Sequence, residues 1–135
     1  MLFRSKIKVD TALITGTDLS KKQTQEAMRK LLSVRNRPTA IIAFNDYVTL
    51  EATRFARREG LKINKDISFV SYANLPITSY LDDPPLVSVE QFPYQQAEKA
   101  TTILLKLIKA KGENTDIPRK IVMESKLVVN SENEK

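Results

Sequence analysis

The residues best suited to chemistry stand in two short stretches, Asn45-Asp46 and Ala73-Asn74. Each stretch follows an apolar segment that is typical of a buried strand, and open parallel sheets bind ligands at the carboxyl ends of their strands. An amide side chain both donates and accepts hydrogen bonds, which favours Asn45 as a ligand contact. Asp46 suits a helix N-cap as well as it suits a ligand. Asn74 is typical of a turn and is kept as a candidate ligand residue.

Phe44 lies at the mouth of the first apolar segment, directly before Asn45. An aromatic ring at this place favours a role in the core over a role as a stacking platform for a ligand. Its position at the strand end still makes it a candidate ligand residue.

The amino-acid types present argue against an enzyme. The sequence has no His, no Cys and three Gly, so thiolate and imidazole chemistry and Gly-rich phosphate loops are excluded. The paired carboxylates Asp82-Asp83 precede Pro84-Pro85, which indicates a solvated turn, whereas a catalytic pair converges from different elements. We therefore expect no catalytic residue, no metal site and no cofactor.

Length and composition indicate one globular domain. The 135 residues carry a net charge of +6 and 41% hydrophobic residues, and no apolar run is long enough to span a bilayer. The basic residues are spread along the whole chain, which favours a solvated cationic surface over a nucleic-acid site. These features, with no membrane contact expected, favour the cytoplasm.

Helices and strands alternate along the first part of the chain. Leu13–Thr15 is a short strand candidate, and a helix follows from Ser20, which forms a capping-box pattern with Gln23. Pro38 ends that helix region and opens the apolar run Thr39–Phe44, which predicts a strand buried on both faces.

The alternation continues to the end of the sequence. Asp46 is a plausible N-cap for a helix that ends at Gly60, and Ile67–Tyr72 predicts a second buried strand. Further along, Leu86–Glu90 predicts a third strand and Pro93 begins a long helix. The remaining strand candidates are Ile121–Met123 and Leu127–Val129. This order predicts an α/β fold with a parallel sheet flanked by helices.

Three motifs in this order resemble the lactose-repressor and galactose-repressor family of bacterial transcription factors. Arg37–Asp46 is similar to the family's R-P-T-A-x-x-x-x-N-D strand. Asp66–Asn74 is similar to D-I-S-V-V-G-Y-D-N, and Pro84–Gln91 is similar to P-P-L-T-T-V-x-Q. The match runs from about Val9 to about Asn130. The resemblance implies an incomplete type I periplasmic-binding-protein-like domain.

The resemblance also implies partners. Members of the family bind a small-molecule effector, a sugar or a nucleobase, between two lobes, and their cores form homodimers. They bind operator DNA only through a helix-turn-helix headpiece, for which this sequence has no counterpart. Residues 1–8 are expected to be part of an earlier element or a non-native leader, 9–130 the C-terminal portion of the effector domain, and 131–135 a polar tail.

The resemblance also implies roles for single positions of this sequence. Leu19 matches a pocket-lining position that is often aromatic, and Asn45 matches a ligand contact. Ala73 replaces an Asp that generally binds the effector, so Asn45 and Asn74 are left to compensate. At the expected dimer interface, Leu50 fits the family pattern, while Asp82 stands where some members have an aromatic residue.

Two other classes share this kind of sheet. A periplasmic-type solute-binding protein for sugar transport is the first alternative, and the D-I-S-x-V and P-P-L-x-x-V motifs favour a regulator over it. A sugar- or nucleotide-modifying enzyme is the second, and the missing His, Cys and Gly-rich loop argue against it.

Overall fold

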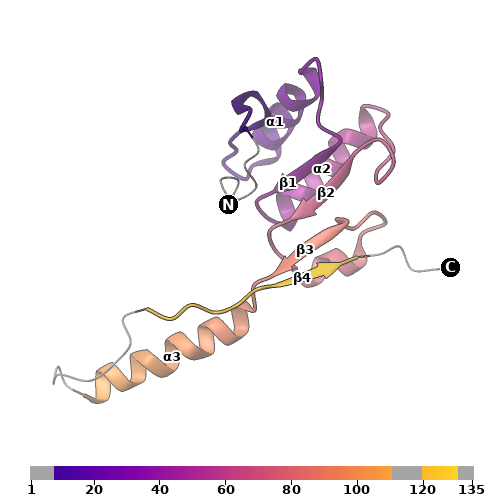
Figure 1. Ribbon diagram of the computed structural model, residues 1–135. Helices are drawn as coiled ribbons and strands as arrows, with labels where there is room; N and C mark the ends of the chain where they lie inside the picture. Colours follow the sequence, from indigo (N-terminus) through magenta and orange to yellow (C-terminus); the bar gives the residue numbers. More distant parts are fainter. Residues whose placement is uncertain (1–7, 111–119, 131–135) are drawn as a thin grey trace.

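The computed structural model describes residues 8–110 and 120–130 (Figure 1). Helices and strands alternate as the sequence predicts. The elements in chain order are a 3₁₀ helix Thr11–Leu13, α1 Lys21–Ser33, β1 Ala40–Ala43, α2 Asp46–Arg58, β2 Ser68–Ser71, a 3₁₀ helix Pro76–Tyr80, β3 Val87–Glu90, α3 Pro93–Lys109 and β4 Lys126–Val129.

The four strands form one sheet in the order β1-β2-β3-β4. The pairs β1–β2 and β2–β3 are parallel, which confirms the predicted α/β sheet. β4 is antiparallel to β3, so the sheet is mixed. The reason is visible in Figure 1: α3 carries the chain away beyond the end of β3, and the returning chain enters the sheet from that end.

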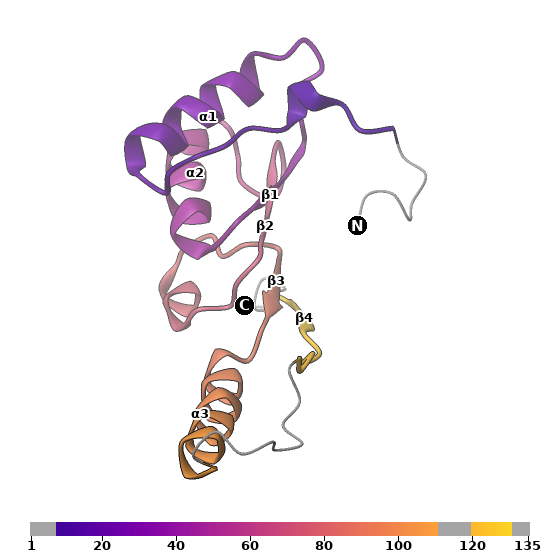
Figure 2. The same cartoon turned by 90° about the vertical axis from the view of Figure 1, so that its left-hand side faces the viewer.

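One face of the sheet is covered by α1 and α2 (Figure 2). The core lies between α2 and this face and contains Phe55, Ala52, Ile67 and Phe69, with Met28 of α1 packed against them. Each of these side chains is less than 5% exposed. The apolar positions of α2 recur at helical spacing, which is why a single stripe of the helix is buried.

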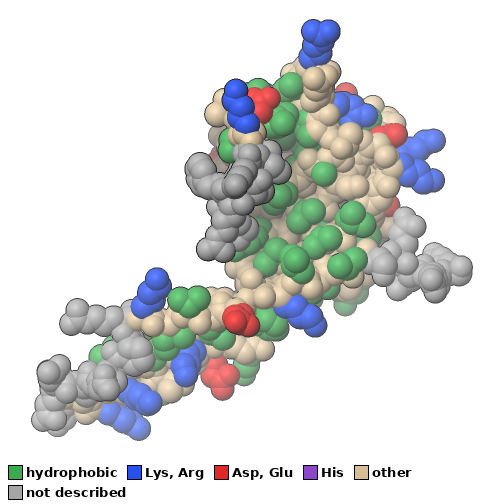
Figure 3. Space-filling model, in the orientation of Figure 1, with side chains coloured by type: hydrophobic (Ala, Val, Ile, Leu, Met, Phe, Trp, Pro, Cys, Tyr) green, Lys and Arg blue, Asp and Glu red, His purple; other side chains and the backbone are tan. Residues whose placement is uncertain are grey.

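The opposite face of the sheet is open in the part of the chain that the structure describes. The register places Ile42, Val70, Val87 and Val129 side by side on this face. Ile42 is 77% exposed. Figure 3 shows hydrophobic side chains gathered on this face. The prediction that Thr39–Phe44 is buried on both faces is therefore wrong, because no described helix covers the second face.

Local signals at the helix ends are largely confirmed. Ser20 is the N-cap of α1, and its hydroxyl accepts a hydrogen bond from the Gln23 amide at 3.2 Å. The reciprocal half of the capping box differs, because the Gln23 side chain accepts from the Asp18 amide. After α2, Gly60 has a φ of +80° and Leu61 donates back to the Ala56 carbonyl, as in a Schellman motif.

Two predicted strands are wrong. Leu13–Thr15 lies partly in the 3₁₀ helix, whose first turn is capped by Asp10 accepting from the Ala12 amide at 2.9 Å. Ile121–Met123 is not in a strand. β3 is four residues long and is fully paired by Lys126–Val129, so the earlier segment lies beyond its end.

The long helix α3 extends away from the rest of the molecule (Figure 1). It begins at Pro93 as predicted, yet none of its 17 residues is buried. Leu104, Leu107 and Ile108, which the sequence places on one apolar face, are all exposed. Local sequence signals therefore predict this helix correctly. Its apolar face is not buried by any of the described residues.

Candidate functional site

The two polar stretches meet at one edge of the sheet. Tyr72 donates its amide to the Ala43 carbonyl at 3.0 Å, which places the ends of β1 and β2 side by side. Asn45-Asp46 and Ala73-Asn74 leave the sheet directly after these ends. The structure therefore brings together the two strand ends that the sequence predicts to be neighbours. The contacts of each side chain show what it does there.

Asn45 caps α2. Its backbone is extended, with φ −157° and ψ 177°, and its side-chain oxygen accepts a hydrogen bond from the Val48 amide at 3.0 Å. The expectation that Asp46 is the N-cap is wrong, because Asp46 is already the first helical residue. Since the Asn45 side-chain oxygen accepts the cap hydrogen bond, the NH₂ group is the part of this side chain that could bind a ligand.

Asp46 ties the start of α2 to the loop after β2. The residue is 1% exposed, and one carboxylate oxygen accepts a hydrogen bond from the Leu75 amide at 2.7 Å. The other oxygen is buried and has no hydrogen-bond partner among the residues that the structure describes. Because the carboxylate anchors backbone that follows Ala73-Asn74, it holds the two polar stretches in a fixed relation.

Asn74 points toward the end of β3. Its NH₂ group donates to one oxygen of Glu90 at 3.0 Å, and the other oxygen accepts from the Phe92 amide at 2.6 Å. These two hydrogen bonds, that from Asn74 first, lower the pKa of Glu90. Phe92 has a φ of +54° and precedes α3, so this network lies where the chain leaves the sheet.

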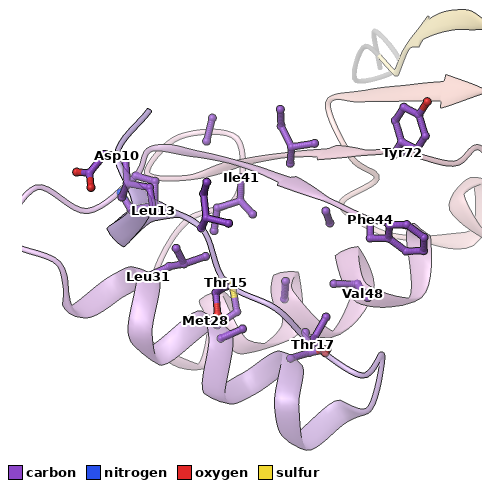
Figure 4. Close-up of a pocket in the computed structure, with 18 of the residues that line it drawn as sticks. Asp10, Leu13, Thr15, Thr17, Met28, Leu31, Ile41, Phe44, Val48 and Tyr72 are labelled. Atoms are coloured by element: carbon purple, nitrogen blue, oxygen red, sulfur yellow. The ribbon is translucent and has the colours of Figure 1, made fainter. Parts of the chain in front are cut away.

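Aromatic side chains are exposed at the same edge. Phe44 is 67% exposed, so the interpretation of Phe44 as a core residue is wrong. Phe44 and Tyr72 directly follow Ala43 and Ser71, the last paired residues of β1 and β2, and in Figure 4 their rings lie apart. Tyr47, in the first turn of α2, is also exposed. Sequence reasoning missed both tyrosines, although each stands within two residues of a polar candidate.

Leu19 lies in a tightly bonded loop before α1. Its φ of +70° is uncommon for a residue with a side chain. The conformation is held by the Leu19 amide donating to the Thr17 hydroxyl at 3.1 Å and by the Ser20 amide donating to Asp18 at 2.8 Å. Hydrogen bonds from Ser20, its hydroxyl first and then its amide, lower the pKa of Asp18. The Leu19 side chain is left exposed.

A groove of about 720 Å³ runs beside β1 (Figure 4). Phe44 and Tyr72 lie at one end of it, while Leu19, Asn45, Ala73 and Asn74 are not among its lining residues. The lining is mainly apolar and comes from residues 8–17, α1, β1 and α2. The groove is therefore distinct from the polar strand ends, and it shares with them Phe44 and Tyr72 alone. Within the described ranges, no acidic cluster could hold a metal ion.

The two residues expected at a dimer interface lie near α2. Leu50 is half-buried on α2. Arg57, two turns further along, pairs with Asp83 and lies 4.0 Å from the exposed carboxylate of Asp82. This ion pair fixes the turn after the 3₁₀ helix Pro76–Tyr80 against α2.

The comparisons with known proteins agree with this architecture. The family model of the periplasmic binding protein-like domain matches residues 4–130. The chain belongs to this family. The repressor CytR of Escherichia coli strain K12, a helix-turn-helix regulator, is 34% identical over 104 residues, which is 77% of this chain. The regulator MalR of Clostridium butyricum is 30% identical over 127 residues, which is 94% of this chain.

Solved structures of regulators have the same fold. A transcriptional regulator LacI from Bacillus cereus superposes with a TM-score of 0.82 at 27% identity, over 95% of this chain and 44% of that one. The complex of the regulator CelR with cellobiose superposes with a TM-score of 0.81 at 26% identity, over 38% of its chain. The chain spans 30% of the length of CytR and 36% of that of MalR. The relatives are regulators of the lactose-repressor type, as the resemblance implies.

Proposed function

We propose that this chain is part of the effector-sensing core of a bacterial transcriptional regulator. The observation that carries the proposal is the agreement of fold and motifs with regulators over 95% of the chain. The family model and the helix-turn-helix relatives support a regulator over a solute-binding transport protein. Relatives that repress transcription also support a protein that is not an enzyme and that works in the cytoplasm.

The effector site of this proposal lies at the ends of β1 and β2. Phe44 and Tyr72 are each exposed at these ends, and aromatic faces stack on the apolar faces of sugars and nucleobases. Asn45 follows Phe44 in the chain, and its NH₂ group is the hydrogen-bond donor of the proposed site. The cellobiose complex of CelR supports a sugar-like ligand class.

Three other candidates have smaller roles in this site. Ala73 has no group that bonds a hydroxyl, so the site lacks a carboxylate at that position. Asn74 is engaged with Glu90, which favours a positioning role for Asn74 over direct ligand contact. Leu19 is proposed as an exposed apolar wall held in place by its loop.

Dimerisation and DNA binding belong to the same proposal. The face of α2 that carries Leu50, with the turn at Asp82, is the proposed dimer surface, and the Arg57–Asp83 ion pair supports its rigidity. Operator DNA would be bound by a headpiece of the kind that gives the relatives their helix-turn-helix description. Among the described helices, α1 and α2 cover one face of the sheet and α3 extends away from it.

The experiment distinguishes a ligand-binding role of Asn45 from its role as the N-cap of α2. Asn45→Asp keeps the side-chain oxygen that caps α2, since Asp is an equally good N-cap, and removes the NH₂ donor. We expect calorimetry with a panel of sugars and nucleosides to show binding to the wild-type chain. The variant is expected to lower that affinity about tenfold, the loss of one hydrogen bond, with an unchanged melting temperature.

Asn36→Asp is the matched control, because it makes the same change at an exposed position outside the site. We expect its affinity to equal that of the wild type. Equal affinities for all three proteins would show that Asn45 is a structural residue only. Binding of no sugar and no nucleoside by the wild-type chain would remove the support for effector sensing by these residues.

A further inference from the structure

Glu90 is the last residue of β3, and its side chain reaches the end of the neighbouring strand β2. The β2–β3 register pairs Ser71 with Ser88, and its continuation by two residues places Glu90 level with Ala73. The NH₂ group of Asn74 donates to one oxygen of the Glu90 carboxylate at 3.0 Å. The carboxylate therefore lies at the same edge of the sheet as the polar strand ends.

Two further hydrogen bonds fix this part of the chain. The Phe92 amide donates to the second oxygen of Glu90 at 2.6 Å. The side-chain amide of Gln91 donates to the Tyr72 carbonyl, so the segment after β3 is tied to the segment after β2. A carboxylate held at both oxygens is preorganised, because little side-chain freedom is left to lose when a ligand binds.

The Glu90 carboxylate keeps capacity for more hydrogen bonds. An ionised carboxylate has about four acceptor sites, and the described residues give one hydrogen bond to each oxygen. These hydrogen bonds, that from Asn74 first, lower the pKa of Glu90, so the group is ionised at neutral pH. Glu90 is half-buried, whereas Asp46, the carboxylate at the start of α2, is 1% exposed. Of these two carboxylates, Glu90 is the one that a ligand in solution can reach.

A lysine stands beside this carboxylate and bears on the kind of ligand it takes. Lys126 of β4 is directly opposite Glu90 in the β3–β4 pairing. Within residues 8–110 and 120–130, no ion pair joins the two side chains. The Lys126 charge still repels a cationic ligand at this place, and the net charge of the chain is +6. A neutral group that offers two adjacent donors, one for each oxygen, fits better, and a vicinal pair of hydroxyls is such a group.

We infer that Glu90 is a specificity-determining residue of the proposed effector site, and that its carboxylate accepts hydrogen bonds from two vicinal hydroxyls of a sugar or of the ribose of a nucleoside. Asn74 is the positioning residue that orients the carboxylate. Ala73, level with Glu90, brings no side-chain donor or acceptor that would compete. The inference rests on the proposed function and adds to it the hydroxyl-bearing class of ligand.

The test is calorimetry on the full chain with three probes. Adenosine has two vicinal hydroxyls on its ribose, dideoxyadenosine lacks both, and cellobiose is the sugar probe. We expect Glu90→Gln to lower the affinity for adenosine and for cellobiose about tenfold or more, because the charged acceptor is lost. The affinity for dideoxyadenosine should be equal in wild type and variant, because this probe makes no hydrogen bond to Glu90. A merely structural role would weaken binding of adenosine and dideoxyadenosine by the same factor.

Three further variants make the result specific. Glu59→Gln makes the same change at an exposed carboxylate outside the site, and we expect unchanged affinities. Lys126→Gln removes the opposite cation and is also expected to leave them unchanged. Asn74→Ala keeps the carboxylate and removes the donor that orients it, so the affinity for adenosine should fall by a smaller factor, about fivefold.

Four outcomes would overturn the inference. Equal affinities of wild type and Glu90→Gln for adenosine and cellobiose would remove the role of Glu90 and leave effector sensing in place. An equal loss for adenosine and dideoxyadenosine would make Glu90 a structural residue. Tighter binding by Lys126→Gln would show that Lys126 occupies the carboxylate. Binding of neither adenosine nor cellobiose by the wild-type chain would overturn the inference together with the function on which it rests.

Discussion

The helices α2 and α3 obey the same local rules and end in opposite surroundings. Both begin at a recognisable signal, and both place apolar residues at helical spacing. Seven of the 13 residues of α2 are buried, whereas none of the 17 residues of α3 is. The difference teaches that helix formation is specified within a segment, while burial depends on which distant elements pack against it.

The largest effect on stability is expected from truncating a core side chain beside α2, compared with truncating an exposed side chain on α3. Phe69→Ala removes a side chain that is 1% exposed between β2 and α2, and we expect the free energy of unfolding to fall by about 3–5 kcal/mol. Leu104→Ala on α3 is the counterpart and should change it by less than about 0.5 kcal/mol. Urea unfolding measures both. A comparable loss for Leu104→Ala would mean that α3 is packed in solution.

A smaller effect is expected at the end of α2. Gly60 has a φ of +80°, which a side chain disfavours, so Gly60→Ala should lower the free energy of unfolding by about 1–2 kcal/mol. Gly16→Ala is the matched control, because an added methyl group meets nothing within 4 Å at either position and only Gly60 of the two has a positive φ. Thermal melts of the two variants test this. Equal melting temperatures would show that the Schellman motif does not hold the helix end in solution.

The smallest effect concerns the junction between the sheet and α3. The pKa of Glu90 is lowered in the folded chain, so its contribution to stability is present above the unfolded pKa and is lost as pH falls through the folded value. Glu90→Gln should therefore flatten the fall in stability below about pH 4.5. Denaturant unfolding across acidic pH values measures the slope. An identical slope in both proteins would show that the Asn74–Glu90 hydrogen bond contributes nothing measurable to the free energy of unfolding.

Features decided by neighbouring residues could be predicted from the sequence. Ser20, Gly60 and Pro93 mark helix ends through cap geometry, and all three are confirmed. The parallel pairing of β1 with β2 followed from alternation of elements, and the motifs indicated the family. The exposed face of β1 could not be predicted, because an apolar run carries no information about what covers it.

The candidate site was predicted less completely. Asn45 and Asp46 are adjacent polar residues that both suit an N-cap, and only the backbone conformation decides that Asn45 caps and Asp46 is buried. The partner of Asn74, Glu90, stands 16 positions away, so its engagement depends on β2–β3 pairing. The exposure of Phe44 could not be predicted, because the sequence does not show what lies beyond the end of β1. The proposed ligand roles of these residues stay predictions.

The pairing of β3 with β4 has a consequence for the order in which the molecule assembles. The whole of α3 lies between the two strands in the chain, so their contact closes a long loop. Asn130 secures the far end, with its side chain donating to the Pro85 carbonyl at 2.9 Å and to the Ser88 hydroxyl at 3.0 Å. Contacts of this kind form slowly compared with local ones. We therefore expect β4 to join the sheet late in folding, after the pairs with shorter connections have formed.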